Sequence, residues 1–249
     1  MSDRSTTTGP AARPEESGEA LFDRADEYDA MLQQGLKLSG EDKHFFIHGR
    51  LADLKDHLPA AFEPRRILDF GCGIGDTSVL LAQSFPGARV VGAETAEQAL
   101  VHARRHHGSE AVSFVSVDEV ADLEPFDLAY VNGVFHHVPP PQRLRAARLI
   151  HDALRPGGCF ALFENNPWNP GTRMVMRRIP FDRDAVTLTP PESRALLRSA
   201  GFAPLATRYL FIFPRPLRAL RFTEALLARL PLGAQYWVLG TRGGGHGVG

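Results

Sequence analysis

Residues Arg66–Gly75 read Arg-Ile-Leu-Asp-Phe-Gly-Cys-Gly-Ile-Gly, and this stretch decides the fold. Its first five residues have the apolar content of a short buried strand, and residues 77–82 continue with the spacing of a helix. The glycines therefore fall at a strand-to-helix turn. Because glycine has no Cβ and adopts positive φ angles at little cost, a nucleoside can lie against the bare backbone of Gly71, Gly73 and Gly75.

The spacing of these glycines argues against a dinucleotide. In the dinucleotide pattern G-x-G-x-x-G, a third glycine packs the helix against the strand beneath a pyrophosphate. Counting from Gly71 and Gly73, that third position is Asp76. A carboxylate there would repel a diphosphate bound to the same helix N-terminus, so an uncharged or cationic ligand fits better.

The pattern Asp69-x-Gly71-x-Gly73-x-Gly75 resembles that of the class I S-adenosylmethionine-dependent methyltransferases of the small-molecule type. The resemblance covers roughly residues 68–158 and extends more loosely from Phe22 to the last strand. It implies S-adenosyl-L-methionine as the cofactor, bound at Asp69 and the three glycines. The structural alternative is a Rossmann-like domain that binds another ligand.

Later segments match the family in the expected order. The strand 89–94 ends at Glu94, which the resemblance places on the two ribose hydroxyls; a carboxylate suits this role because it offers two acceptor oxygens. Asp118 and Glu119 follow the strand 112–117, where the family binds adenine. Asn132 ends the strand 126–132, and the loop 133–138 after it resembles the family's loop that faces the methyl group.

Strands and helices alternate from residue 66 to residue 164, which predicts an α/β fold. We expect a Rossmann-like, doubly wound, seven-stranded and mostly parallel sheet with an N-terminal helical lid and a C-terminal helical insertion. A single domain spans 20–241, with the lid at 20–60, the cofactor-binding core at 61–164 and the acceptor-side half at 165–241. Residues 1–19 form a disordered tail and 242–249 a flexible one. In the acceptor-side half, the pattern predicts a strand at 205–213, a helix at 216–230 and a final strand at 235–240.

The lid segment contains side chains that can reach a ligand. Tyr28 is the preferred cofactor contact, because its phenol can bond a carboxylate while its ring covers the pocket. Lys43 and Arg50 are further candidates for the methionine end of the cofactor or for the acceptor. For each of these residues the alternative is packing or solvation.

Composition limits the partners of the chain. The formal net charge is −1, which argues against a general attraction to nucleic acid. The two cysteines have neither the spacing of metal ligands nor the density of a disulfide framework. No secretion signal or run of about 20 apolar residues is visible, so we expect a cytoplasmic protein with no integral membrane segment. In the helix 216–230, leucines share one face and arginines lie elsewhere, which suits core packing, a homodimer contact or a membrane surface.

Three residues are candidates for catalysis. His136 and His137 follow the fourth strand, and an imidazole that titrates near neutral pH suits a general base that removes a proton from an acceptor hydroxyl. Glu164, at the end of the fifth strand, can orient that hydroxyl or bond loop amides. The acidic trio of magnesium-dependent catechol enzymes is missing, so no metal is expected.

The predicted reaction is methyl transfer to a small-molecule acceptor, with a hydroxyl of a specialised metabolite or of a glycan or lipid-linked intermediate as the favoured acceptor. Carbon and nitrogen acceptors remain open. One alternative uses the same cofactor for a cyclisation or rearrangement without net transfer. Another is a non-catalytic partner subunit that keeps the fold.

Overall fold

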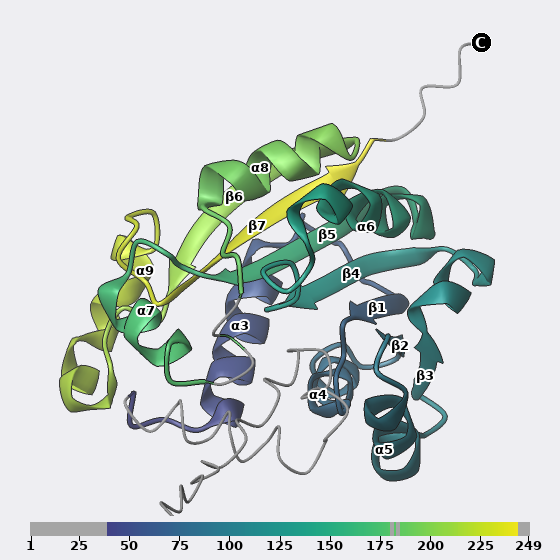
Figure 1. Ribbon diagram of the computed structural model, residues 1–249, viewed down its shortest axis with the longest axis horizontal. Coiled ribbons are helices and arrows are strands. Elements are labelled where there is room, and N and C mark those ends of the chain that lie inside the picture. Colours follow the sequence, from purple (N-terminus) through teal and green to yellow (C-terminus); the bar gives the residue numbers. More distant parts are fainter. Residues whose placement is uncertain (1–38, 180–181, 183–184, 244–249) are drawn as a thin grey trace, which may run out of the picture.

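The computed structural model describes residues 39–179, 182 and 185–243. The predicted tail 1–19, the first part of the lid and Tyr28 lie outside these residues. Within them, seven strands form one sheet in the order β3-β2-β1-β4-β5-β7-β6 (Figure 1). The strands are β1 (Arg66–Phe70), β2 (Arg89–Glu94), β3 (Val112–Ser116), β4 (Phe126–Asn132), β5 (Leu154–Asn165), β6 (Phe202–Leu210) and β7 (Gln235–Arg242).

Helices connect these strands and cover both faces of the sheet. The α-helices are α3 (Lys43–His57), α4 (Asp76–Ser84), α5 (Glu97–His107), α6 (Pro140–Ala153), α7 (Pro170–Met176), α8 (Pro190–Ser199) and α9 (Glu224–Leu227), and the 3-10 helices are η1 (Val117–Asp122) and η3 (Arg215–Thr223). Strands β1 to β5 pair in parallel, and β7 runs antiparallel to β5 and β6. This arrangement confirms the predicted Rossmann-like fold with its mostly parallel sheet.

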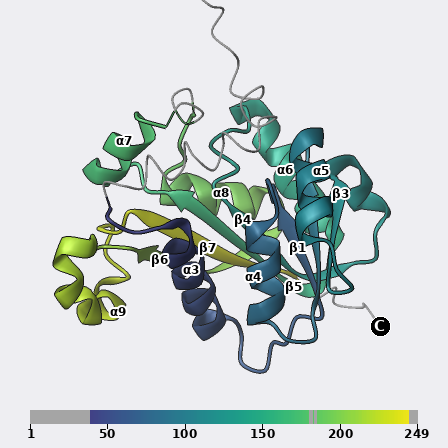
Figure 2. The ribbon, with the colours of Figure 1, turned by 90° about the horizontal axis from the view of Figure 1, so that it is seen from below.

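The core has two layers, one on each face of the sheet. Helices α3, α4 and α5 pack on one face, as the view in Figure 2 shows for α3 and α4, and α6 and α8 pack on the other. Successive side chains of a strand alternate between the layers, so Ile67 lies in the first and Leu68 in the second. Burial on both faces explains why these strands appear in the sequence as nearly continuous apolar runs.

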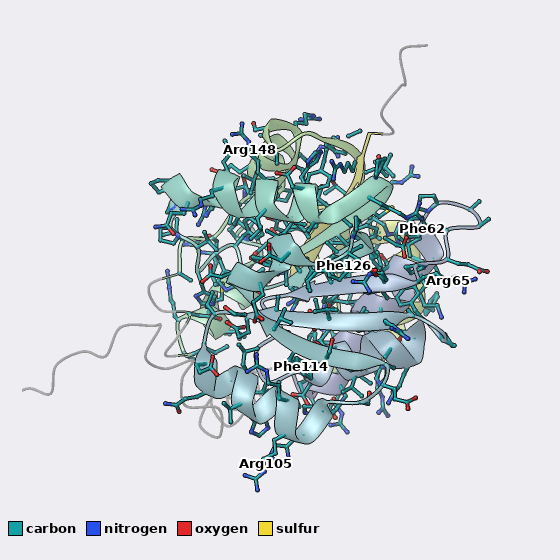
Figure 3. The ribbon with its side chains drawn as sticks, turned by 90° about the vertical axis from the view of Figure 1, so that its right-hand side faces the viewer. Phe62, Arg65, Arg105, Phe114, Phe126 and Arg148 are labelled. Carbon is teal, nitrogen blue, oxygen red and sulfur yellow. The ribbon has the colours of Figure 1, made fainter. Side chains whose placement is uncertain are left out.

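The glycine turn between β1 and α4 is as tight as its sequence predicts. Gly71, Gly73 and Gly75 have φ angles of +73°, +54° and +93°. A Cβ at Gly75 would lie 2.7 Å from the ring of Phe114, a residue of β3 that is labelled in Figure 3. A Cβ at Gly71 would lie 2.3 Å from Val134. At Gly71 and Gly75 the turn is thus so close to the loop after β4 and to β3 that only glycine fits.

Helix α3 is anchored to the far half of the sheet by one carboxylate. Asp53 accepts hydrogen bonds from Arg208 of β6, at 3.0 Å to Nε and 2.8 Å to Nη2, and from Nε1 of Trp237 on β7 at 2.8 Å. Because all three groups are largely buried, this contact fixes where the helix lies on the sheet.

The bounds of the last two strands differ from the prediction, and β6 also ends at Leu210 rather than at 213. Strand β6 begins at Phe202 rather than 205, since Gly201 ends α8 at a φ of +104° and the chain turns directly into the sheet. Strand β7 continues to Arg242, where a flexible tail was expected, because the Arg242 guanidinium donates to the carbonyls of His151, Asp152 and Leu154.

The predicted helix 216–230 is also wrong as a single element. It consists of the 3-10 helix η3 and the four-residue α9, and Leu217 has non-helical angles inside the first. The face that was expected to pack is open, since Leu220 and Leu230 are 43% and 48% exposed. The helical spacing of apolar residues in a sequence does not by itself show whether that face packs against the protein or is exposed to solvent.

Replacing the anchoring carboxylate should loosen α3. We expect Asp53→Ala to lower the free energy of unfolding by about 2–3 kcal/mol, because the buried donors of Arg208 and Trp237 lose their acceptor. Asp56→Ala, on the exposed face of the same helix, should change it by less than about 0.5 kcal/mol. Chemical denaturation checks both values, and equal losses in the two variants would contradict the anchoring role.

Candidate functional site

A cavity of about 470 Å³ opens beside the carboxyl ends of β1 and β4, where ligands of such sheets bind. Its walls come from α3, the glycine turn, the loop after β4, the insertion around α7 and the segment after β6. Eight of the candidate residues named from the sequence line it: Lys43, Arg50, Asp69, Gly71, Gly73, Asn132, His136 and His137. The elements that carry them are far apart in the chain and meet only in the fold.

Glu94 lies behind the glycine turn rather than on the cavity wall. Its Oε2 accepts a hydrogen bond from the backbone nitrogen of Gly73 at 2.9 Å, and its Oε1 accepts one from the nitrogen of Thr95 at 2.7 Å. The carboxylate therefore holds the turn in place. Oε2 has one such partner among the described residues, which leaves a second lone pair for a ligand.

Asp118, Glu119 and Gly75 do not line the cavity either. Asp118 and Glu119 are in the first turn of η1, and Oε2 of Glu119 accepts from the nitrogen of Ser116 at 2.7 Å in a capping box. This bond gives Glu119 a structural role at the helix start. Gly75 serves the close packing on Phe114 described above.

Two residues of opposite charge face one end of the cavity. Arg50 of α3 is buried, and its guanidinium donates to two neutral partners, from Nε to the hydroxyl of Tyr130 and from Nη1 to Oε1 of Gln235, both at 3.0 Å. Asp69 accepts from the Ser78 hydroxyl at 2.6 Å. Burial raises the pKa of Asp69 to about 7, against the lowering effect of Ser78 and of Arg50. This end therefore suits a group that carries both a carboxylate and an ammonium.

Near the glycine turn, the cavity offers an unsatisfied acceptor and open space. Oδ1 of Asn132 is buried and has no hydrogen-bond partner among the described residues. An orphaned buried acceptor costs about 1–3 kcal/mol, so a ligand donor at this point would be favourable. A Cβ at Gly73 would meet nothing within 4 Å, although the backbone there has a positive φ. The structure thus keeps a bare surface over the turn for a ligand.

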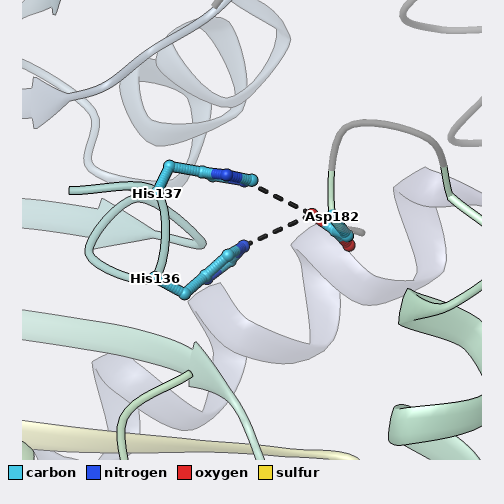
Figure 4. A group of neighbouring side chains, drawn as sticks. All are labelled: His136, His137 and Asp182. Carbon is cyan, nitrogen blue, oxygen red and sulfur yellow. Dashed lines mark ion pairs between the residues drawn. The ribbon is translucent and has the colours of Figure 1, made fainter. Parts of the chain in front are cut away.

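At the other end, His136 lies between two carboxylates. Its Nδ1 is 2.6 Å from Oε2 of Glu164, whose Oε1 accepts from the backbone nitrogen of Phe135 at 2.8 Å. Its Nε2 is 3.4 Å from Oδ1 of Asp182, and Nε2 of His137 is 3.3 Å from the same oxygen (Figure 4). Glu164 is therefore placed beneath His136 rather than on the cavity wall.

This arrangement bears on the predicted general base. Burial lowers the pKa of His136, but Glu164 and Asp182 outweigh burial and raise the pKa to about 10. A ring that donates from both nitrogens to carboxylates has no lone pair with which to take a proton from an acceptor. His136 and Glu164 thus fit a positioning role better than the role of base, whereas His137 is partly exposed to the cavity.

Some lining residues were missed or undervalued in the sequence. Asp182 belongs to the insertion after β5, and no motif marks it. Arg50 was named only as one of several candidates, although the sequence pattern sets it apart. It lies on the same buried face of α3 as Ile47, Leu51 and Leu54. A charged residue on an apolar helix face requires a buried partner or a ligand.

Comparison with known proteins supports the sequence resemblance. A family model described as a methyltransferase domain matches residues 68–160. A trans-aconitate 2-methyltransferase of Methylobacterium nodulans is 35% identical over 130 residues, 51% of this chain and 48% of the relative. A ubiquinone biosynthesis O-methyltransferase of Bordetella avium is 31% identical over 166 residues, 61% of this chain and 67% of the relative.

Solved structures share the fold. Human N-acetylserotonin methyltransferase in complex with S-adenosylmethionine superimposes with a TM-score of 0.64 at 18% identity, over 93% of this chain and 60% of that one. The chain spans about half the length of the first curated relatives it matches. The glycine turn, the order of the strands and these likenesses agree, and the chain belongs to the class I S-adenosylmethionine-dependent methyltransferases.

Proposed function

We propose that this protein transfers a methyl group from S-adenosylmethionine to an oxygen of a small-molecule acceptor. The observation that carries the proposal is that one cavity joins the glycine turn to the histidine cluster. Two of the relatives are named for trans-aconitate methylation and for O-methylation in ubiquinone biosynthesis. These names favour an oxygen atom of a small organic molecule as the methyl acceptor. A hydroxyl of a lipid-linked or specialised metabolite fits the same geometry.

The residues at the Arg50 end fit the cofactor. Arg50 would bind the carboxylate of its methionine part and Asp69 the ammonium, because each lines the cavity with the opposite charge. The bare turn at Gly73 would take the adenosyl group, and the free lone pair of Glu94 would accept from the ribose. When bound, S-adenosylmethionine supplies an electrophilic methyl group on a sulfonium.

The remaining walls suit an acceptor with an apolar part. Phe46 and Phe211 pack edge to face with ring centroids 4.9 Å apart, and Met176 and Ile179 lie on the insertion side. These side chains give the cavity an apolar lining that an apolar part of the acceptor would contact. Alignment in a dry cavity is the main contribution an enzyme makes to a displacement of this kind.

An exposed apolar patch lies beside the cavity mouth, and we propose that it contacts a membrane surface. The patch consists of Leu217, Leu220, Phe222, Leu226 and Leu230 on and after η3 and α9. Phe222 and Leu226 are 82% and 84% exposed, and the exposed Arg215, Arg218 and Arg229 are interspersed with the patch. Apolar side chains with arginines suit an anionic interface. No helix in the described ranges is long and apolar enough to cross a membrane.

Adding a methyl group to the turn should block the cofactor without unfolding the protein. Gly73→Ala and Gly87→Ala both place a Cβ in open space at a positive φ, so each should cost about 1 kcal/mol of stability. Only Gly73 lines the cavity. Calorimetry with S-adenosylhomocysteine should show binding at least about tenfold weaker for Gly73→Ala and unchanged for Gly87→Ala. Equal binding by both variants would remove the cofactor assignment at this turn.

The reaction itself is tested by its two products. With labelled S-adenosylmethionine and a panel of phenols, polyprenyl phenols and carboxylates such as trans-aconitate, mass spectrometry should find S-adenosylhomocysteine and a methylated acceptor in equal amounts. Arg50→Met should reduce kcat/KM by about tenfold or more, since the cofactor carboxylate loses a buried partner. Product formation without S-adenosylhomocysteine would instead support the cyclisation alternative, and binding without turnover a non-catalytic subunit.

The apolar patch makes a separate prediction. The protein should sediment with vesicles that contain phosphatidylglycerol, and the double variant Phe222→Ser/Leu226→Ser should bind them roughly tenfold more weakly. Val101→Ser, which removes an exposed apolar side chain from α5, is the matched control. Absence of vesicle binding by the wild type would refute the contact, and a dimer that the double variant dissociates would assign the patch to a homodimer.

A further inference from the structure

We infer that His136, His137 and Asp182 form a binding site for a divalent transition-metal ion on the acceptor side of the cavity. Nε2 of each histidine and an Asp182 oxygen lie within 4.8 Å of one another. Figure 4 shows both imidazole rings directed at the same carboxylate. All three residues line the cavity, so an ion held by them would be open to the acceptor.

The separations of the two histidine nitrogens from the Asp182 oxygen are those of ligands around an ion. Charge-assisted hydrogen bonds between nitrogen and a carboxylate oxygen are about 2.7–2.9 Å long. Here the two nitrogens are 3.4 Å and 3.3 Å from Oδ1 of Asp182. Ligands bound at about 2.0–2.2 Å in tetrahedral or octahedral geometry lie about 3.0–3.5 Å apart. The cluster is therefore spaced for an ion rather than for short direct bonds.

A hydrogen bond from behind prepares His136 for this role. Nδ1 of His136 is 2.6 Å from Glu164, and Glu164 is fixed in turn by the backbone nitrogen of Phe135. When an ion takes the place of the proton on Nε2, the proton on Nδ1 stays hydrogen-bonded to Glu164, and the lone pair of Nε2 points toward the ion beside Asp182. A carboxylate that holds the far nitrogen of a histidine is the usual support of a metal-binding imidazole. Glu164 is thus a positioning residue, and it is buried.

The charge of the cluster favours a cation. Imidazoles that bind an ion through Nε2 carry no net charge, so Glu164 and Asp182 then bring two negative charges into a site where they are 1% and 7% exposed. Buried carboxylates are costly unless they are paired or coordinate a metal. Two imidazole nitrogens and one carboxylate oxygen suit Zn²⁺, Fe²⁺, Mn²⁺ or Co²⁺ better than Mg²⁺ or Ca²⁺, which prefer oxygen ligands throughout.

Three protein ligands leave coordination positions free, as in catalytic rather than structural metal sites. An ion there would bind the acceptor oxygen and lower the pKa of its proton, which supplies the activation that His136 is badly placed to give. The sequence-based expectation of no metal rested on the missing acidic trio and did not consider ligands from the insertion. The proposed site goes beyond the proposed function, since ion binding does not depend on which acceptor is methylated.

The test is metal binding by the full chain, freed of metal by a chelator. Titration with Zn²⁺ in a calorimeter should show one tight site, and Co²⁺ should give a visible absorption band from nitrogen and oxygen ligands that Zn²⁺ abolishes. His137→Ala and Asp182→Asn should each weaken binding by at least about tenfold. His106→Ala is the matched control, because His102 and His106 on α5 form a surface pair, with ring centroids 4.4 Å apart, that also offers two imidazoles.

Each result decides the matter. No stoichiometric Zn²⁺ binding by the wild type would overturn the site, as would binding that survives in both His137→Ala and Asp182→Asn or that is lost in His106→Ala. Circular dichroism and calorimetry with S-adenosylhomocysteine show whether a variant is still folded. Wild-type protein that binds S-adenosylhomocysteine and methylates its acceptor at an undiminished rate after chelation would refute the role of the ion in activating the acceptor while leaving the proposed function intact.

Discussion

The site depends on the close packing of the glycine turn against its neighbours on β3 and in the loop after β4. Its first glycine lies against Val134, in the loop that carries the histidines, and its third lies against Phe114 of β3. The turn therefore fixes the distance between the surface for the cofactor and the loop for the acceptor. No side chain can occupy either glycine position without moving one of these neighbours. The cavity is the space that this packing leaves between the turn and α3.

Charge divides the cavity into two ends with different tasks. At one end, Arg50 and Asp69 are buried close to the sheet, and the burial that raises the pKa of Asp69 also strengthens its attraction for a cation. At the other end, His136 and His137 face Asp182, with Glu164 behind them. Other parts of the walls are aromatic and aliphatic. Such a division suits a ligand that is ionic at one end and reactive at its centre.

The strands of the cofactor-binding core were predictable from the sequence, because they are short apolar runs. In β2 and β4 the run ends at a polar residue. The runs that end at Glu94 and Asn132 were placed correctly, since burial on both faces leaves few alternatives for such segments. The region after β5 was less predictable. Its leucine and arginine pattern at 216–230 has the period of a packed helix, although the chain there is a 3-10 helix with an open face.

The candidate site divides in the same way. Residues next to the glycine motif were found because the motif sets their position, whereas Asp182 comes from an insertion whose path no local pattern determines. Arg50 was undervalued because the sequence of the helix does not show its partners on the sheet, Tyr130 and Gln235. The roles of Asp182 and Arg50 depend on contacts between segments that are distant in the chain. Secondary-structure propensity and residue spacing do not reveal such contacts.

The bond network of Asp53 joins segments that lie far apart along the chain. Its partners Arg208 and Trp237 are 155 and 184 residues away from it. A fragment that contains α3 and the glycine turn but lacks β6 and β7 would therefore lack the groups that seat this helix. The cavity wall to which Arg50 belongs thus depends on a complete sheet, in which β7 lies between β5 and β6.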